Sequence, residues 1–231
     1  MSAADPTAAN IARWDAIFSS RAWGRYPPEE LIRFVARTYP DAAMRREMRA
    51  VEVGCGPGPN LWYLAREGFA VAGIDGSGSA IATAKDRLRA EGVLDERRPP
   101  DLRVGNFATL PWESSSFDLA VDIGALTSAT SATVRCAIAE IFRVLKPGGW
   151  FFGRMFGPGT TGADTGKMLE ERTTENPAEG PLKGMGVIHV FTEEEVRQWF
   201  GAFSELRLDW IHRSDRNRSC FFYDWVVQAR K

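Results

Sequence analysis

The stretch VEVGCGPGPNLWYLAREGF, residues 51–69, places three glycines at alternate positions between a short apolar run and a helix-like segment. Gly54, Gly56 and Gly58 have no Cβ, so the backbone there can turn tightly and a ligand or a helix can approach it closely. In an open α/β sheet, ligands bind beyond the carboxyl ends of the strands. The stretch therefore predicts a ligand-binding turn between a strand and a helix.

Short β-rich runs alternate with helix-like segments on both sides of this turn. The runs that predict parallel strands are residues 49–54, 70–75, 101–106, 117–124 and 149–156. The segments with helical spacing are residues 11–18, 28–39, 59–68, 78–92, 133–146 and 192–203. Two further runs, 206–214 and 219–230, flank a short polar turn and predict an antiparallel hairpin. The pattern is that of an α/β Rossmann-like doubly wound sheet of seven strands, mostly parallel, with an antiparallel C-terminal hairpin and helices on both faces.

The length of 231 residues fits a single domain. Within it, residues 1–48 are expected to form N-terminal helices, 49–156 the cofactor-binding core, 157–190 an acceptor-site loop, and 191–231 a C-terminal helix and hairpin. The segment 157–187 is rich in glycine and proline. It is expected to be a long loop with at most one helical turn, at 166–173.

Composition restricts the class of partner. There are 29 basic and 30 acidic residues, which gives a formal net charge of −1 and no broad positive field for nucleic acid. The three cysteines lack zinc-site or disulfide spacing, which favours a reducing cytoplasm. The chain shows neither a leader pattern nor a long apolar run, and it has no carboxylate cluster for a metal. We therefore expect a small-molecule partner, no nucleic acid, no membrane and no metal.

The spacing of the glycines separates two cofactor classes. A dinucleotide fingerprint, G-x-G-x-x-G, requires a sixth-position glycine, but Pro59 or Leu61 stands there. The other pattern, E-x-G-x-G-x-G, is complete with Glu52 as its acid. Asp75 closes the next strand, where an acid can accept from both hydroxyls of a ribose.

Two further blocks follow these motifs in order, LPWESSSFDLAV (110–121) and RVLKPGG (143–149). With them, the sequence resembles the class I S-adenosylmethionine-dependent methyltransferases over about residues 50–230. The resemblance is to small-molecule enzymes of the thiopurine-, tellurite- and methyltransferase-11/25-like branch. It implies S-adenosylmethionine as cofactor, S-adenosylhomocysteine as product, no metal, and in-line methyl transfer to an O, N or S atom of a small acceptor. Asn106 stands where the family has an Asp for the adenine amino group. The cofactor-binding residues that it implies are Glu52, Gly54, Cys55, Gly56, Gly58, Asn60, Asp75, Gly76, Ser77, Asn106, Phe107, Asp122 and Ile123.

Two residues are candidates for catalysis. His189 is either a general base near the cleft or a loop histidine that caps a helix or faces solvent. Asp122 ends the fourth strand and could orient the cofactor ammonium, act as a base, or satisfy neighbouring backbone groups. Cys55 is either a nucleophile or, as we favour, a small buried residue whose backbone N–H faces the ligand.

Aromatic residues near the N-terminus resemble the cover of thiopurine- and tellurite-type enzymes. Trp14 and Trp23 are core aromatics in the simplest interpretation, but the resemblance implies that they form a lid with the segment 157–187. Apolar residues near the cleft favour a partly apolar acceptor. The alternatives are an inactive cofactor-binding or partner module and, less favoured, an NAD-dependent oxidoreductase. Either a monomer or a homodimer is expected.

Overall fold

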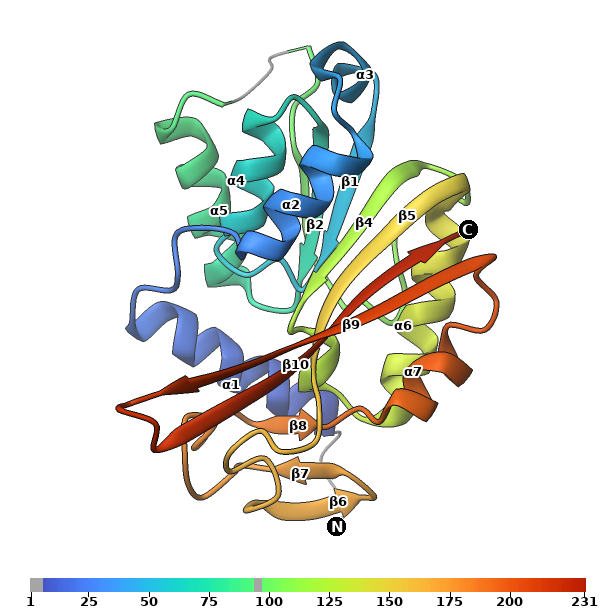
Figure 1. Cartoon of the computed structure of the whole chain (residues 1–231). Coiled ribbons are helices and arrows are strands. Elements are labelled where there is room, and N and C mark those ends of the chain that lie inside the picture. Colours follow the sequence, from blue (N-terminus) through green and yellow to red (C-terminus); the bar gives the residue numbers. More distant parts are fainter. Residues whose placement is uncertain (1–5, 94–96) are drawn as a thin grey trace.

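The computed structural model describes residues 6–93 and 97–231, so the first five residues of the predicted N-terminal segment lie outside the described part. Its main sheet has the strand order β3-β2-β1-β4-β5-β10-β9 (Figure 1). The strands β1 to β5 are parallel, whereas β10 runs antiparallel to both β5 and β9. The predicted seven-stranded sheet with its C-terminal hairpin is thus confirmed. The strands are β1 Arg49–Val53, β2 Ala70–Asp75, β3 Asp101–Val104, β4 Phe117–Ile123, β5 Leu145–Phe156, β9 Glu205–Asp215 and β10 Cys220–Arg230.

Helices cover both faces of this sheet. The helices are α1 Pro6–Ser20, α2 Glu29–Thr38, α3 Ala42–Arg46, α4 Pro59–Arg66, α5 Gly78–Ala90, the 3₁₀ turn η1 Leu126–Ser128, α6 Ser131–Val144 and α7 Glu193–Trp199. Apolar residues of α2, α4 and α5 share one buried cluster with the sheet, and those of α6 and α7 share another. Because successive side chains of a strand point to opposite faces, Ala50 belongs to the first cluster while Val51 and Val53 belong to the second.

Local sequence features explain where α7 begins and where α6 ends. Helix α7 begins with a capping box in which Thr192 and Glu195 satisfy each other's backbone N–H groups. Helix α6 ends at Val144, two residues before the predicted end, because Leu145 already pairs with Phe117 as part of β5. The short elements α3 and η1 were not predicted.

The segment between β5 and α7 differs from the prediction. It contains a second, antiparallel sheet of β6 Lys167–Glu170, β7 Thr173–Glu175 and β8 Val187–His189. The predicted helical turn at 166–173 is wrong, because this stretch forms β6 and a tight turn in which Arg172 has a φ of 57°. The predicted loop is therefore ordered by a small sheet of its own.

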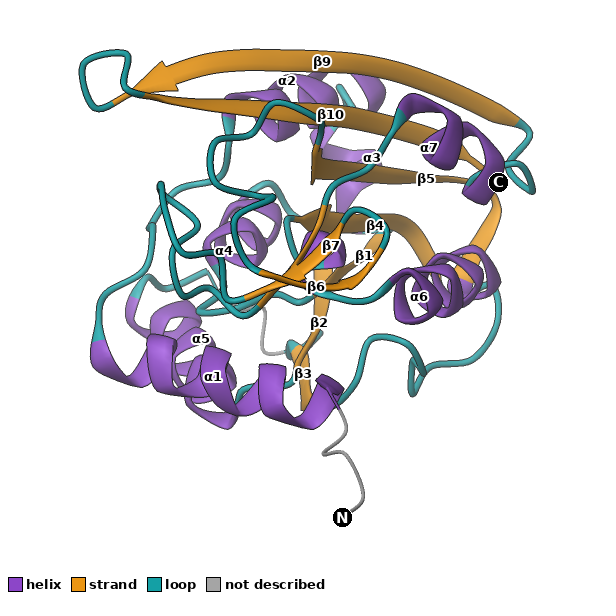
Figure 2. Cartoon of the chain, turned by 90° about the horizontal axis from the view of Figure 1, so that it is seen from below, coloured by secondary structure: helices purple, strands orange, loops and turns teal. Residues whose placement is uncertain are grey.

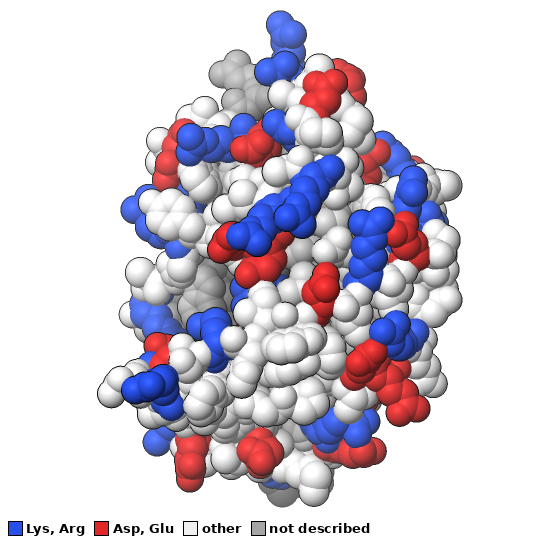
Figure 3. All heavy atoms as spheres, in the orientation of Figure 1, with Lys and Arg blue, Asp and Glu red and all other residues white. Residues whose placement is uncertain are grey.

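Charges are mixed over the surface. Lysine and arginine alternate with acidic residues on the face shown in Figure 3, and no large patch of one sign is visible there. Within residues 6–93 and 97–231, no helix is both long enough and apolar enough to span a bilayer.

The strand order reverses beside β1, which has β2 on one side and β4 on the other. The carboxyl ends of these three strands therefore meet at one edge, at the position where doubly wound sheets bind ligands. Helix α1 packs on α5 and lies across this edge of the sheet (Figure 2).

Candidate active site

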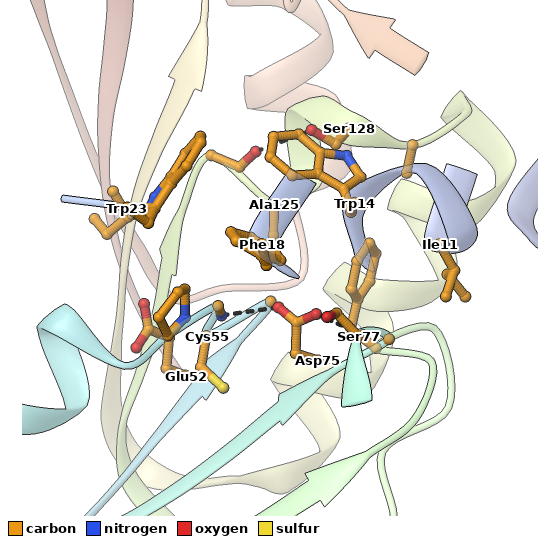
Figure 4. Close-up of a pocket in the computed structure, with 18 of the residues that line it drawn as sticks. Ile11, Trp14, Phe18, Trp23, Glu52, Cys55, Asp75, Ser77, Ala125 and Ser128 are labelled. Carbon is orange, nitrogen blue, oxygen red and sulfur yellow. Dashed lines mark hydrogen bonds between the residues drawn. The ribbon is translucent and has the colours of Figure 1, made fainter. Parts of the chain in front are cut away.

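A cavity of about 250 Å³ opens at the carboxyl ends of β1, β2 and β4. Figure 4 shows Trp14, Phe18 and Trp23 across the cavity from Glu52 and Asp75. Gly58, Asp122 and His189 do not line it. The predicted residues that do line it are Trp14, Trp23, Glu52, Gly54, Cys55, Gly56, Asn60, Asp75, Gly76, Ser77, Asn106, Phe107 and Ile123.

The three glycines of the turn have different tasks. Gly54 and Gly56 line the cavity with φ values of 61° and 50°, which favour glycine. A Cβ on Gly54 would stand 2.0 Å from the Cβ of Ala125. Gly58 precedes α4 with a φ of 77°, and a Cβ on it would stand 3.0 Å from the Cβ of Ala84. The structure thus places Gly58 against α5 rather than in the cavity, so its predicted role in cofactor contact is corrected to helix packing.

Asp75 links the ends of two strands. Its Oδ2 accepts a hydrogen bond of 2.8 Å from the N–H of Gly56, and its Oδ1 accepts one of 2.8 Å from the N–H of Ser77. Burial raises the pKa of this carboxyl, while the two N–H groups act in the opposite direction. Each carboxylate oxygen can accept more than one hydrogen bond, so both can still accept from a ligand hydroxyl.

Glu52 is the second acid of the cavity, and 2% of its surface is exposed. Its Oε1 accepts a hydrogen bond of 2.6 Å from Nδ2 of Asn60, whereas its Oε2 is buried without a partner. Burial raises the pKa of this carboxyl well above its ordinary value. A buried oxygen without a partner costs free energy, which a donor or a cation on a ligand would relieve.

Cys55 is buried beneath the turn, and burial raises the pKa of its thiol well above the ordinary value. A thiol with a raised pKa is a poor nucleophile, in agreement with the interpretation as a small buried residue. Its N–H donates to the carbonyl of Ile74 over 3.1 Å. The prediction that this N–H faces the ligand is therefore wrong.

The turn after β3 supplies the next part of the lining. Asn106 is exposed, and its Oδ1 accepts a hydrogen bond of 2.8 Å from the N–H of Ala108. The amide oxygen therefore already serves a local turn and has one remaining lone pair for a ligand. Phe107 lines the cavity beside it and packs partly into the core.

Three aromatic rings form a cluster over the cavity. The ring centroids of Trp14 and Phe18 lie 5.4 Å apart, and Trp23 meets them edge-on at 5.7 Å and 5.4 Å respectively. Nε1 of Trp14 is buried without a hydrogen-bond partner. From the segment 157–187, only Val187 lines the cavity.

Polar contacts hold α1 in place over the turn. Oδ1 of Asp15 accepts hydrogen bonds from Oγ of Ser77 (2.6 Å) and from N and Oγ of Ser79 (3.1 and 2.8 Å) at the start of α5. These hydrogen bonds lower the pKa of Asp15. Asn10 donates to the carbonyl of Ser128 over 2.6 Å and accepts from the N–H of Val187 over 3.0 Å. Neither Asp15 nor Asn10 was singled out from the sequence, because their partners are distant along the chain.

His189 lies on β8 and is fully buried outside the cavity. Its Nδ1 is 2.7 Å from Oγ1 of Thr173, and its ring stacks on Trp199 with centroids 5.5 Å apart. Burial lowers the pKa of the imidazole, and the nearby Glu195 opposes this shift. The structure thus gives His189 a packing position, and the expectation that it serves as a base in the cleft is corrected.

Asp122 is buried at the end of β4 and also stands outside the cavity. Its Oδ1 accepts hydrogen bonds of 3.0 Å from the N–H groups of Ala125 and Leu126, while its Oδ2 has no partner. Burial raises its pKa to about 7, although these N–H groups act against the shift. Of the three expected roles, the satisfaction of backbone groups is the one that this geometry fits.

Replacing Asp122 by Asn is expected to stabilise the protein above neutral pH. The folded-state pKa of about 7 exceeds the ordinary 3.8, so the unfolded chain releases this proton first and stability falls as pH rises from 4 to 7. The Asn side chain keeps the two hydrogen bonds and removes the ionisation. We expect its free energy of unfolding to exceed that of the wild type by about 4 kcal/mol at pH 8 and to be nearly equal at pH 4. Urea unfolding at both pH values, without ligand, measures this, and an equal difference at both values would contradict it.

A family model described as a methyltransferase domain matches residues 51–153, which contain Glu52, the glycine turn, Asp75 and the strands β2 to β4. Residues 51–153 are a class I S-adenosylmethionine-dependent methyltransferase domain. A solved relative, an S-adenosylmethionine-dependent methyltransferase from Methanosarcina mazei, is 27% identical with a TM-score of 0.63, and the match covers 80% of this chain and 92% of that one.

One further relative and one further solved structure are similar to this chain. Squalene methyltransferase 2 from Botryococcus braunii is 36% identical over 105 residues, which are 45% of this chain and 26% of that protein's length. The matched part is thus about a quarter of this curated relative. The structure of magnesium protoporphyrin IX methyltransferase from Synechocystis with bound S-adenosylhomocysteine is 17% identical, with a TM-score of 0.64 over 96% of this chain and 94% of that one, and it shows the same fold.

Proposed function

We propose that this protein transfers the methyl group of S-adenosylmethionine to an O, N or S atom of a small-molecule acceptor. The observation that carries the proposal is the pair of acids at the edge of the glycine turn. Asp75 is held by two backbone N–H groups, and Glu52 has a buried oxygen without a partner. A ligand with a diol at one end and an ammonium group at the other fits this pair, and S-adenosylmethionine carries both groups.

Different residues of the cavity contact different parts of the cofactor. Asp75 accepts from the ribose hydroxyls, and Oε2 of Glu52 accepts from the ammonium group. Gly54 and Gly56 give the cofactor room at the turn. Phe107 lies beside the adenine, and Asn106 supplies a weaker contact to its amino group. Gly76, Ser77, Asn60 and Ile123 also line the cavity and complete its wall.

The chemistry rests on positioning. S-adenosylmethionine, when bound, supplies a sulfonium methyl group that is already electrophilic. The protein holds the acceptor in line with it, and such orientation lowers the barrier by many kcal/mol. Among the described residues that line the cavity, Glu52 and Asp75 are the only charged ones, and no histidine is present. We therefore expect an acceptor atom with a free lone pair at neutral pH, which needs no general base from the protein.

The acceptor is expected to be partly apolar. The rings of Trp14, Phe18 and Trp23, together with Ala129 and Val187, offer an apolar wall beside the cofactor residues. Thr130 and Thr133 add hydroxyl groups that can orient a polar end of the acceptor. The cytoplasmic location predicted from the cysteine pattern stays a prediction.

Isothermal titration and methyl transfer test the function together. S-adenosylmethionine and S-adenosylhomocysteine should bind in the micromolar range, NAD should not, and labelled methyl groups should appear on members of a panel of apolar aromatic amines, N-heterocycles, thiols and phenols. Binding without transfer to any acceptor would favour a cofactor-binding module. Binding of NAD in place of S-adenosylhomocysteine would refute the proposal.

Replacing Trp23 by Ala is expected to weaken S-adenosylhomocysteine binding several-fold. Trp23 is 37% exposed and meets the other two rings edge-on, so its removal opens the aromatic cluster to water without emptying the core. The dissociation constant measured by titration checks this. Trp210→Ala, at an exposed tryptophan on β9, is the matched control and should bind as the wild type does. An unchanged affinity in Trp23→Ala would end the hypothesis of an aromatic lid.

A further inference from the structure

Strand β9 forms one edge of the main sheet. It pairs with β10 from Glu205 to Asp215, and no other strand in the described parts of the chain pairs with its outer side. Figure 2 shows β9 along the outer border of the molecule. A strand edge of this length carries unpaired N–H and C=O groups that can pair with another chain.

One face of this strand is aromatic and exposed. Trp210 is 59% exposed, and its ring stacks on Tyr223 with centroids 5.5 Å apart and planes 12° apart. His212 follows on the same face and contacts Tyr223 and Phe221, of which Phe221 is 40% exposed. Large exposed aromatics on a free edge strand are unusual for a surface that stays in water.

The other face carries charges of alternating sign on both sides of Ile211. Arg207 and Asp209 precede it, and Arg213 and Asp215 follow it at the same two-residue spacing. Within the described parts of the chain, Asp209 makes no ion pair or side-chain hydrogen bond, and Arg213 lies over the ring of Phe222 with no acidic partner.

We propose that β9 pairs antiparallel with β9 of a second copy of this chain, about a two-fold axis at Ile211. A two-fold axis perpendicular to the sheet keeps corresponding faces on the same side, so Ile211 faces its own copy. Asp209 then faces Arg213 of the second copy, and Arg207 faces Asp215. By symmetry each pair occurs twice, and opposite charges at directly opposed positions stabilise strand pairing.

The neighbouring symmetric registers bring like charges together. With the axis at Trp210, Arg207 would face Arg213 of the second copy. With the axis at His212, Asp209 would face Asp215, and an axis at Asp209 or Arg213 would place that residue opposite itself. The register at Ile211 also brings Trp210 against His212 of the second copy and covers the exposed ring. Axes at Leu208 or Ser214 would also oppose Arg207 to Asp209 or Arg213 to Asp215, but they pair a shorter part of β9. Charge complementarity and the length of paired strand together favour a second copy of this chain in the register at Ile211.

The expected dimer is weak. A single pair of short strands buries an area at the low end of the range for specific interfaces, so we expect a dissociation constant in the micromolar range. Sedimentation velocity from about 1 to 200 µM protein should show a concentration-dependent dimer. Because both ion pairs lie at the surface, raising the salt concentration should weaken it.

Charge reversal and its rescue test the register. Asp209→Arg places arginines opposite each other, and Arg213→Asp does the same with acids, so each variant should dimerise about ten-fold more weakly than the wild type. The double variant Asp209→Arg/Arg213→Asp restores opposite charges and should return to within about three-fold of the wild type. Glu47→Arg, at an exposed position after α3, is the control and should leave dimerisation unchanged.

Three results would overturn the proposal: a wild type that stays monomeric over this range, a dimer that Asp209→Arg leaves unchanged, or a double variant weaker than both single variants. Thermal unfolding followed by circular dichroism verifies that all variants fold, as expected for substitutions at exposed positions. The test uses no cofactor, so its result is independent of whether the protein transfers methyl groups.

Discussion

Asp75→Ala is expected to weaken S-adenosylhomocysteine binding about 100-fold or more, because the substitution removes two contacts that each involve a charged group. In the proposed complex the carboxylate accepts from both ribose hydroxyls. It also accepts from the N–H groups of Gly56 and Ser77, so its loss removes the link that holds the glycine turn against the start of α5. Isothermal titration of wild type and variant measures the change.

Two comparison variants separate this role from a general loss of stability. Asp75→Asn would turn an N–H₂ group toward one of the two backbone N–H donors, so it should bind nearly as poorly as Asp75→Ala. Asp118→Ala is the matched control, since Asp118 also accepts from a backbone N–H, that of Arg49, and pairs with Lys146 at the opposite end of the sheet. It should keep its affinity within about three-fold even where its melting temperature falls. A folded Asp75→Ala that binds as tightly as the wild type would refute the assignment of the cofactor to this turn.

Gly54→Ala is expected to lower the free energy of unfolding by about 3 kcal/mol and to abolish measurable cofactor binding. Two costs add up in this variant. The new Cβ would stand 2.0 Å from the Cβ of Ala125, and the residue would keep a φ of 61°, which an L side chain adopts only with strain. Urea unfolding and titration with S-adenosylhomocysteine give the two readouts.

The clash and the backbone strain can be measured separately. In Gly54→Ala/Ala125→Gly the colliding methyl group is gone, so the double variant should regain the packing cost and retain a deficit of about 1 kcal/mol from the φ angle. Gly24→Ala is the control, because Gly24 lines the same cavity and a Cβ there meets no atom within 4 Å. A double variant no more stable than Gly54→Ala would show that the contact with Ala125 does not set the cost.

Much of the fold follows from local pattern. The strands β1, β2 and β4 are short, mostly apolar runs bounded by turn residues, and the alternation of strands with helices implies parallel neighbours. The small sheet β6–β8 was missed because its strands are short, carry no regular apolar alternation and are held by pairings across a glycine-rich segment. Gly166 shows this dependence, since a Cβ on it would stand 2.5 Å from the carbonyl oxygen of Glu175.

The site residues could be predicted from the sequence where the backbone conformation requires a particular residue at a particular spacing. Gly54, Gly56, Glu52 and Asp75 occur at spacings that the turn and the strand ends require, and all of them line the cavity. The sequence pattern does not reveal the direction in which a single side chain points at the end of a strand. Asp122 bends back to the N–H groups of Ala125 and Leu126, as only the course of the following turn reveals.

His189 illustrates the same difficulty on β8. The chain passes the cavity at Val187, and two residues later His189 stands among Phe191 and Trp199 in the core. Proximity along the sequence to a cavity residue was therefore not enough to place the imidazole. The contacts of Asp15 with Ser77 and Ser79 lay beyond sequence reasoning for another reason, since they join α1 to a helix more than sixty residues away.

The way α1 is attached allows it to detach from the cavity without unfolding of the rest of the domain. This helix contributes no residue to the three buried clusters. It is fastened by hydrogen bonds of Asn10, Arg13 and Asp15 and by apolar contacts of Ile11, Trp14 and Phe18 at the cavity. Its release therefore breaks these contacts and leaves the sheet intact. The amide protons of α1 should exchange with solvent through a local opening that costs far less free energy than global unfolding. The amide protons of β1 and β4 should exchange only when the whole domain unfolds. The helix that covers the cavity and the rest of the domain thus have different free energies of opening. A ligand can enter or leave at the rate at which α1 opens, without unfolding of the domain.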